Sequence, residues 1–155
     1  MTDNESKPAS YWNTPFTKIC LGMKADNITN WIKLDYEASS LYSVMADGTF
    51  RATSAGRSAW KTLINGSSLQ LNCNKEGFNI KELNNVQISA RLGLIANNEY
   101  NCLSSDSWIG YGVSYTTTCI LGFVSSTSCG NEANCLTSAD NGDKTIAAFG
   151  YFLVQ

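Results

Sequence analysis

Histidine is absent from the 155-residue sequence, and this absence excludes several kinds of chemistry. A self-contained Ser-His-Asp or Cys-His nucleophile, a mixed Cys/His zinc site and imidazole acid/base catalysis all require that side chain. Paired carboxylates are then the sets of side chains that we consider for general acid/base catalysis.

Charge is also scarce, with 11 Lys and Arg against 13 Asp and Glu and a net charge of −2. The basic residues form no cluster, so the sequence offers no electrostatic footprint for nucleic acid or for an anionic membrane surface. The longest apolar run is a handful of residues, far short of the roughly 20 that a membrane-spanning helix requires. We therefore expect no nucleic-acid partner and no membrane insertion.

Cysteine occurs six times, an even number in a chain that is rich in uncharged polar residues. No CxxC pair occurs, so a zinc knuckle or a thioredoxin-like motif lacks its usual spacing. We expect disulfides, three if every cysteine pairs, although spacing does not choose their connectivity. Buried free thiols in an intracellular protein are the alternative. The predicted disulfide cysteines are Cys20, Cys73, Cys102, Cys119, Cys129 and Cys135.

The polar composition is typical of an extracellular surface. Asn, Ser, Thr and Gln account for 50 residues, about twice the number of charged ones. N-glycosylation sequons begin at Asn4, Asn27 and Asn65. Residues 1–10 contain no apolar signal region, so either the leader peptide is missing from this chain or the protein is not secreted by that route, and we expect the first.

Alternation of apolar and polar residues is the main structural pattern, and it is typical of half-buried strands. It predicts strands at residues 16–23, 31–36, 86–94, 108–115, 119–124 and 145–154.

Two segments are expected to interrupt this pattern. Asp47 and Gly48 stand between two β-prone runs in residues 41–54 and predict a tight hairpin. Residues 55–65 place apolar side chains at helical spacing, with Thr53 or Ser54 as the cap and Gly66 as the stop.

These elements together predict an all-β fold, an antiparallel β-sandwich or jelly roll with one short helix and disulfide crosslinks. A closed barrel is the second choice. Residues 11–155 are expected to form a single domain behind a flexible N-terminal tail of residues 1–10.

Five segments carry a family resemblance: WKTLINGSSLQLNCNKEGFN, ARLGLIANNEYNC, SSDSWIGYG, SCGNEA and AAFGYFLVQ. They resemble a pattern of uncharacterised extracellular domains in secreted proteins of cnidarians and other marine invertebrates. The resemblance extends over residues 16–155. It implies a secreted adhesion, matrix or recognition module, and it carries over no catalytic activity or ligand.

Residues 97–111 are the strongest candidate ligand site, because sugars bind to aromatic faces surrounded by hydrogen-bonding side chains. The candidate donors and acceptors are Asn97, Asn98, Glu99, Asn101 and Asp106, and the candidate platforms are Tyr100, Trp108 and Tyr111. The alternative is a loop anchored by a disulfide, with Trp108 in the core.

Acidic residues suggest weaker sites of two kinds, one for a metal ion and one for catalysis. Asp140 and Asp143 flank a glycine turn and could ligate Ca²⁺, although a plain hairpin turn explains them more simply. The carboxylate pairs Glu99 with Asp106, and Asp35 with Glu37, could support glycoside hydrolysis.

We therefore predict an extracellular recognition or adhesion module, lectin-like, with glycans or glycoproteins as partners. The alternative is a structural matrix subunit that assembles as a homo-oligomer, and a glycoside hydrolase ranks third. The protein is expected not to be an enzyme and to need no cofactor, apart from the calcium considered above.

Overall fold

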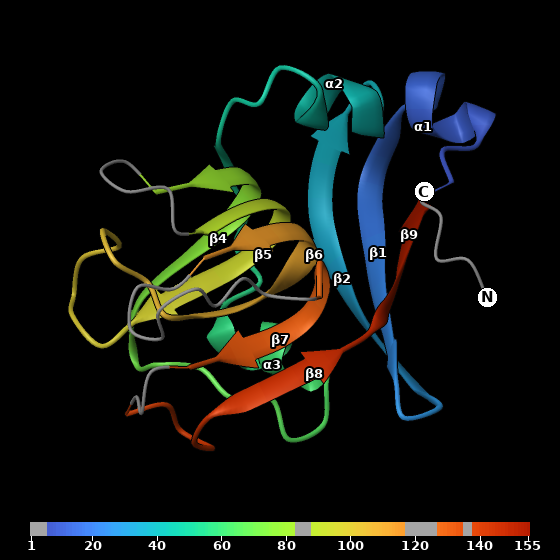
Figure 1. The fold of residues 1–155 in the computed structure, drawn as a ribbon. Helices are drawn as coiled ribbons and strands as arrows, with labels where there is room; N and C mark the ends of the chain where they lie inside the picture. The colour runs from blue at the N-terminus through green and yellow to red at the C-terminus, as the bar shows by residue number, and fades with distance from the viewer. Residues whose placement is uncertain (1–5, 83–87, 117–126, 135–137) are drawn as a thin grey trace.

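The computed structural model describes residues 6–82, 88–116, 127–134 and 138–155. Its strands form two antiparallel sheets that face each other, so the predicted β-sandwich is confirmed (Figure 1). The smaller sheet has the order β2-β1-β9, with β1 at Phe16–Ala25, β2 at Ile28–Ala38 and β9 at Phe149–Val154.

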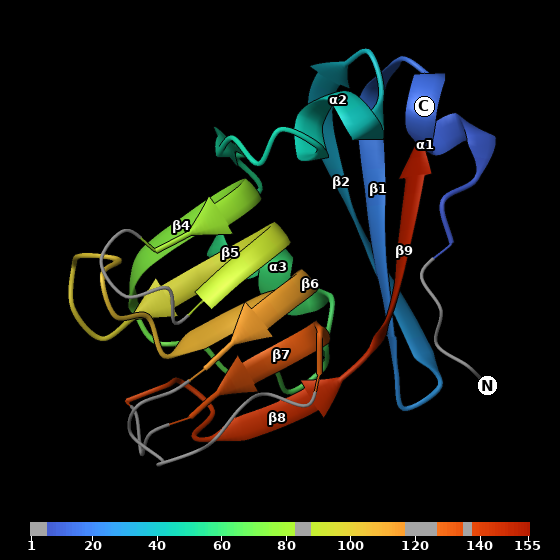
Figure 2. The same cartoon turned by 45° about the horizontal axis from the view of Figure 1, so that its top comes forward.

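Among the described residues, the larger sheet has six strands in the order β3-β4-β5-β6-β7-β8, which is also their order in the chain. Each of these strands therefore lies beside the next one along the chain, as in a meander (Figure 2). The bounds are β3 Arg51–Ala52, β4 Asn72–Lys81, β5 Ile88–Asn97, β6 Ser107–Tyr115, β7 Cys129–Ala133 and β8 Lys144–Ala147.

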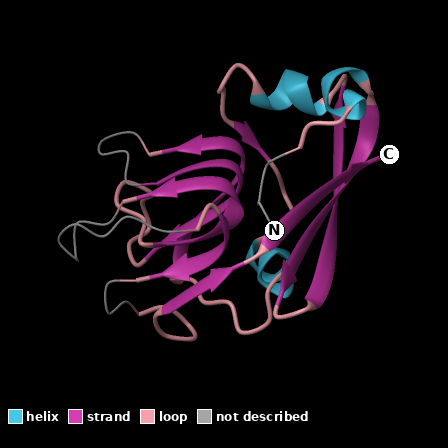
Figure 3. Ribbon diagram, turned by 45° about the vertical axis from the view of Figure 1, so that its right-hand side comes forward, coloured by secondary structure: helices cyan, strands magenta, loops and turns pink. Residues whose placement is uncertain are grey.

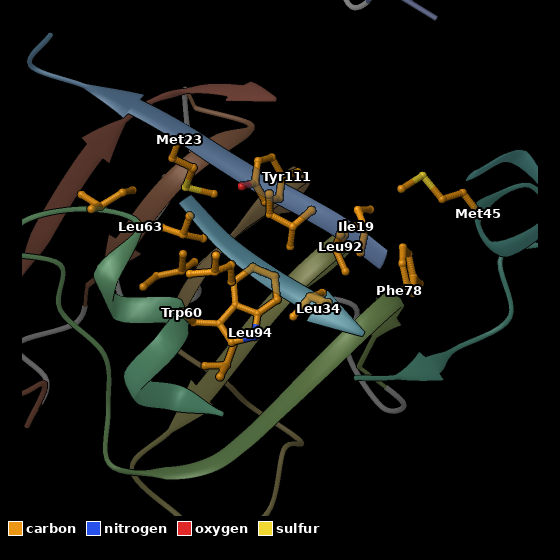
Figure 4. Close-up of a cluster of buried hydrophobic side chains, with 14 of the residues drawn as sticks. Ile19, Met23, Leu34, Met45, Trp60, Leu63, Phe78, Leu92, Leu94 and Tyr111 are labelled. Carbon is orange, nitrogen blue, oxygen red and sulfur yellow. The ribbon is translucent and has the colours of Figure 1, made fainter. Parts of the chain in front are cut away.

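The main core fills the space between the two sheets. Alternate residues of β1 and β2, such as Ile19 and Leu34, meet Leu94 and Ile109 of the six-stranded sheet (Figure 4 shows part of this cluster). Because successive side chains in a strand point to opposite faces, Ile95 and Trp108 point away from the smaller sheet. They belong to a second buried cluster, whose other members are Ile80, Ile88, Ala90, Val113 and Tyr115.

Three short helices complete the described structure: α1 at Ala9–Asn13, α2 at Leu41–Met45 and α3 at Arg57–Thr62. Helices α1 and α2 lie together at one end of the sandwich, and α3 lies near the other end (Figure 3). Helix α1 begins at Ala9, within residues 1–10 that the sequence analysis assigns to an N-terminal tail, and none of its residues is buried.

The predicted hairpin at Asp47 and Gly48 is wrong, because the first of its two β-prone runs is helix α2. Ser40 and Ser43 form a reciprocal capping box that starts the helix, and Val44 and Met45 face the core. Gly48 follows with φ of +68°. Asp47 binds Arg51 through both carboxylate oxygens and accepts a hydrogen bond from the Thr49 amide, so these residues form a turn after a helix.

The predicted helix of residues 55–65 is confirmed as α3, but its cap is different. The N-cap residue is Gly56, and not Thr53 or Ser54 as predicted. The carboxylate of Glu76 on β4 accepts hydrogen bonds from the amides of Ala55 and Gly56 and from Trp60 Nε1. Glu76, which is distant in sequence, therefore binds the amide groups at the start of the helix, a role that the local pattern had assigned to Thr53 or Ser54.

The predicted strand of residues 145–154 is divided at Ala148 between the two sheets. Strand β8 pairs with β7, whereas β9 pairs with β1, so one short segment crosses from one sheet to the other (Figure 1). The predicted strand of residues 119–124 lies outside the described residues.

The prediction of three disulfides is wrong, because Cys20 and Cys129 are free thiols. Cys73 and Cys102 form a disulfide that joins the start of β4 to the loop between β5 and β6, with their Cα atoms 5.3 Å apart. Cys119 and Cys135 lie outside the described residues. Burial raises the pKa of the Cys129 thiol to about 12, which keeps it protonated at neutral pH.

Candidate binding face

The predicted ligand loop connects β5 to β6, and most of its amide side chains form hydrogen bonds that hold the loop itself in place. The Asn97 side chain is buried and donates to the Asn101 carbonyl at 2.9 Å. The Asn101 carboxamide accepts from the Leu103 amide at 3.0 Å, and the Asn98 carbonyl accepts from Asn72 at 2.6 Å. These contacts fix the backbone and leave fewer amide groups for a ligand.

The three aromatic residues proposed for this loop do not form one surface. Tyr100 is 92% exposed at the tip, whereas Trp108 is fully buried in the second cluster. Tyr111 lies in the main core, and its hydroxyl donates to the Gly22 carbonyl at 3.1 Å across the sandwich. Trp108 and Tyr111 therefore face opposite sides of the six-stranded sheet, and the sheet separates them.

The two carboxylate pairs differ in their surroundings. Burial raises the pKa of Asp106; a hydrogen bond from Gln70 opposes this shift, and the charge of Glu99 adds to it. Asp35 is exposed on β2 and forms an ion pair with Lys33 at 3.7 Å. Glu37 is also exposed and lines a shallow open pocket beside Pro15, Phe16, Thr17, Ala38, Ser39 and Gln155.

Asp140, the candidate calcium ligand, is a structural anchor. Its carboxylate accepts hydrogen bonds from Arg57 at 2.8 Å, from the Leu69 amide at 3.1 Å, and from Lys61. Burial alone would raise the pKa of Asp140, but these hydrogen bonds outweigh burial and lower it. Asp143 is exposed nearby in sequence. In the described part of the chain, no three His, Cys, Asp or Glu side chains cluster as metal ligands.

A different group of aromatic residues is gathered on the outer surface of the three-stranded sheet. Trp31 of β2 and Tyr151 of β9 both pair with Gly22 of β1, so the three residues form one row across the sheet. The ring centroids of Trp31 and Tyr151 are 5.6 Å apart, and those of Tyr151 and Phe149 are 5.0 Å apart. We call Trp31, Tyr151, Phe149 and Leu153 the aromatic face.

This face is open to solvent. Trp31 is 46% exposed, Phe149 50% and Leu153 57%, while the residues that alternate with them point into the core. The six-stranded sheet packs on the inner side of this sheet, and no described element covers its outer side (Figure 1). Large apolar side chains gathered in this way mark interaction sites more often than singly exposed ones do.

Gly22 is what lets the aromatic rings lie close to the sheet. A Cβ at this position would come within 2.5 to 2.8 Å of three atoms of the Trp31 benzo ring. Any larger residue would thus push the indole away from the strand. The glycine provides a recess between Trp31 and Tyr151 that the indole occupies.

Polar groups surround the aromatic face. Lys24 pairs in register with Phe149 on one side and with Thr29 on the other. Lys33 follows Trp31 by two residues on β2 and is therefore on the same side of the sheet. The face thus combines flat apolar rings with the ammonium groups of Lys24 and Lys33 and the hydroxyl group of Thr29 at its margin.

Sequence reasoning missed this face for identifiable reasons. Trp31 alternates along the strand with Lys33 and Asp35, and therefore lies on the side that the pattern predicts to be polar and exposed. This position was the signal that could have identified Trp31 as an exposed aromatic residue. In β9 both sets of alternate residues are apolar, so the pattern does not say which set is exposed.

Comparisons with protein-family models, with curated protein sequences and with solved structures find no match to this chain. In the described residues, no helix has the length and apolar character needed to cross a membrane.

Proposed function

We propose that the protein is an extracellular recognition module that binds carbohydrate through the aromatic face. The observation that carries this proposal is the row Trp31, Gly22, Tyr151, extended by Phe149, which presents aromatic rings on an uncovered sheet. Pyranose rings have apolar C–H faces that stack on such side chains, and their hydroxyls accept and donate hydrogen bonds at the margin.

The preorganisation of the rings supports this function. Trp31 lies over Gly22, and Tyr151 packs between Trp31 and Phe149, so each ring restrains its neighbour. Little side-chain entropy is then lost when a ligand settles on the face, which improves affinity for a given contact area. The rings also stand on strands, and sites built on strands are held more precisely than sites built on loops.

An extracellular location is supported by the Cys73–Cys102 disulfide, since such bonds persist in oxidising compartments. The disulfide fastens the β5–β6 loop and lies on the six-stranded sheet, away from the aromatic face. Its role is therefore to stabilise the domain and not to shape the ligand site.

The test is binding of Trp31→Ala and Trp12→Ala variants to a glycan array, followed by titration of each positive glycan. Trp12 is 52% exposed on α1 and outside the aromatic face, so it is a matched control for loss of an exposed indole. Loss of the Trp31 contact should weaken binding by at least about tenfold, equivalent to about 1.4 kcal/mol, while Trp12→Ala binds normally.

A third variant, Tyr100→Ala, separates this proposal from binding by the 97–111 loop. If Tyr100→Ala abolishes glycan binding and Trp31→Ala does not, the loop is the site and the aromatic face is not. If the wild-type protein binds no glycan on the array, carbohydrate recognition itself is contradicted.

A further inference from the structure

In the part of the chain that the structure describes, the two sheets end in four edge strands, and three of them carry features that discourage pairing with another chain. Strand β3 has only two residues. Strand β8 has only four, and its first residue is the charged Lys144. Strand β2 is long, but the exposed side chains along it include Lys33, Asp35 and Glu37. Short length and charge are the usual devices that protect sheet edges.

Strand β9 has none of these protections. Its six residues, FGYFLV, contain no charge and no proline, and it lies at the edge of the three-stranded sheet (Figure 2). Strongly apolar edge strands of this kind pair readily with other strands.

The backbone hydrogen bonds show which groups of β9 point outward. Gln155 and Lys18 exchange both of their backbone hydrogen bonds, at 2.9 and 3.0 Å. In an antiparallel pair this exchange recurs at every second residue, so Leu153, Tyr151 and Phe149 bond to β1. The N–H and C=O groups of Gly150, Phe152 and Val154 therefore point away from β1, and no backbone hydrogen bond from another described segment reaches them.

We infer that β9 pairs in antiparallel fashion with β9 of a second copy of this chain. A two-fold axis at Phe152 would let Gly150 of one copy bond to Val154 of the other, and would satisfy all the outward groups of β9 at once. The two three-stranded sheets would become one six-stranded sheet.

This register also explains the exposed leucine. With the axis at Phe152, Leu153 of one copy lies directly opposite Tyr151 of the other, in a pair without backbone hydrogen bonds, where side chains approach most closely. The exposed Leu153 would then be covered by an aromatic ring. Because the axis is perpendicular to the sheet, both aromatic faces lie on the same side and form one continuous surface.

The inference is tested by light scattering coupled to size-exclusion chromatography over a wide range of protein concentration. We expect a dimer whose population rises with concentration. Leu153→Lys and Tyr151→Glu should each yield a monomer, because each places a charge against an apolar residue of the other copy. Mixing the two variants should restore a dimer, since the new Lys and Glu then face each other. Leu71→Lys is the matched control, because Leu71 is 61% exposed just before β4.

Hydrogen exchange provides a second readout that needs no substitution. The amides of Gly150, Phe152 and Val154 should exchange more slowly at high protein concentration than at low, while other edge amides such as those of β8 do not change. A monomer at every concentration, a dimer that Leu153→Lys leaves intact, or exchange rates independent of concentration would each overturn the inference.

Discussion

The two fully buried tryptophans provide a sharp test of the packing, because their indole N–H groups have opposite surroundings. Trp60 Nε1 donates to the Glu76 carboxylate at 2.6 Å. Trp108 Nε1 is buried and has no hydrogen-bond partner among the described residues. Replacing each in turn by phenylalanine removes a similar volume at both sites but has different polar consequences.

The difference can be estimated from the contacts. At Trp60 the substitution removes a hydrogen bond to a charged acceptor, which costs about 1.5 to 3 kcal/mol. At Trp108 it removes an unsatisfied buried donor, whose desolvation costs about 1 to 3 kcal/mol in the native protein. Trp60→Phe should therefore destabilise the protein by at least about 2 kcal/mol more than Trp108→Phe does.

Thermal unfolding followed by circular dichroism measures this difference directly. For a domain of this length about 2 kcal/mol corresponds to a melting temperature that is about 4 to 8 °C lower for Trp60→Phe than for Trp108→Phe. Alanine at either site should cost about 3 to 5 kcal/mol, since both indoles are in the core. Equal melting temperatures for the two phenylalanine variants, or the reverse order, would refute the assignment of Trp108 to an unsatisfied buried position.

Three other predictions concern the disulfide, the Asp140 anchor and Gly22. Replacing both Cys73 and Cys102 by serine should cost about 3 to 4 kcal/mol in denaturant unfolding, because the bridge spans 29 residues; an unchanged midpoint would contradict this. The folded-state pKa of Asp140 is lowered, so its contribution is complete at neutral pH and is lost on acidification. The stability gap between wild type and Asp140→Asn should thus shrink below about pH 4, and a gap that widens there would contradict the ion pairs. Gly22→Ala should leave the melting temperature nearly unchanged but alter Trp31 fluorescence, because the exposed ring can move aside. Gly93→Ala should destabilise, because its Cβ would lie 2.6 Å from the backbone oxygen of Ile109, and equal losses in the two variants would contradict this reading.

The sequence was sufficient for the features that depend on local alternation. The strand predicted at residues 86–94 corresponds to β5 in the described residues from Ile88 onward, since one set of alternate positions is apolar throughout. The predicted helix was also found, because its apolar residues recur at helical spacing and Gly66 follows at φ of +74°.

Features that depend on contacts between distant residues could not be predicted in this way. In residues 41–45 a capping box and core contacts outweighed the turn preference of Asp47 and Gly48. In β9 both faces are apolar, and the division at Ala148 depends on pairing with β1, 125 or more residues earlier in the chain.

The candidate site shows the same limit. Residues 97–111 have a suitable composition for a ligand loop, but composition does not reveal that Trp108 and Tyr111 face opposite sides of a sheet. The aromatic face is assembled from β2 and β9, whose aromatic residues are about 120 positions apart in the sequence. They are brought together because Trp31 and Tyr151 both pair with Gly22 of β1.

The location of the glycan site is tested most directly by nuclear magnetic resonance, with a positive glycan from the array titrated into isotopically labelled protein. We predict that the amides of Gly22, Trp31 and Tyr151, and the Trp31 indole N–H, show the largest chemical-shift changes. Their titration curves should agree with the affinity measured for the wild-type protein. Shifts confined to residues 97–106, with the amides of β1, β2 and β9 unchanged, would contradict it.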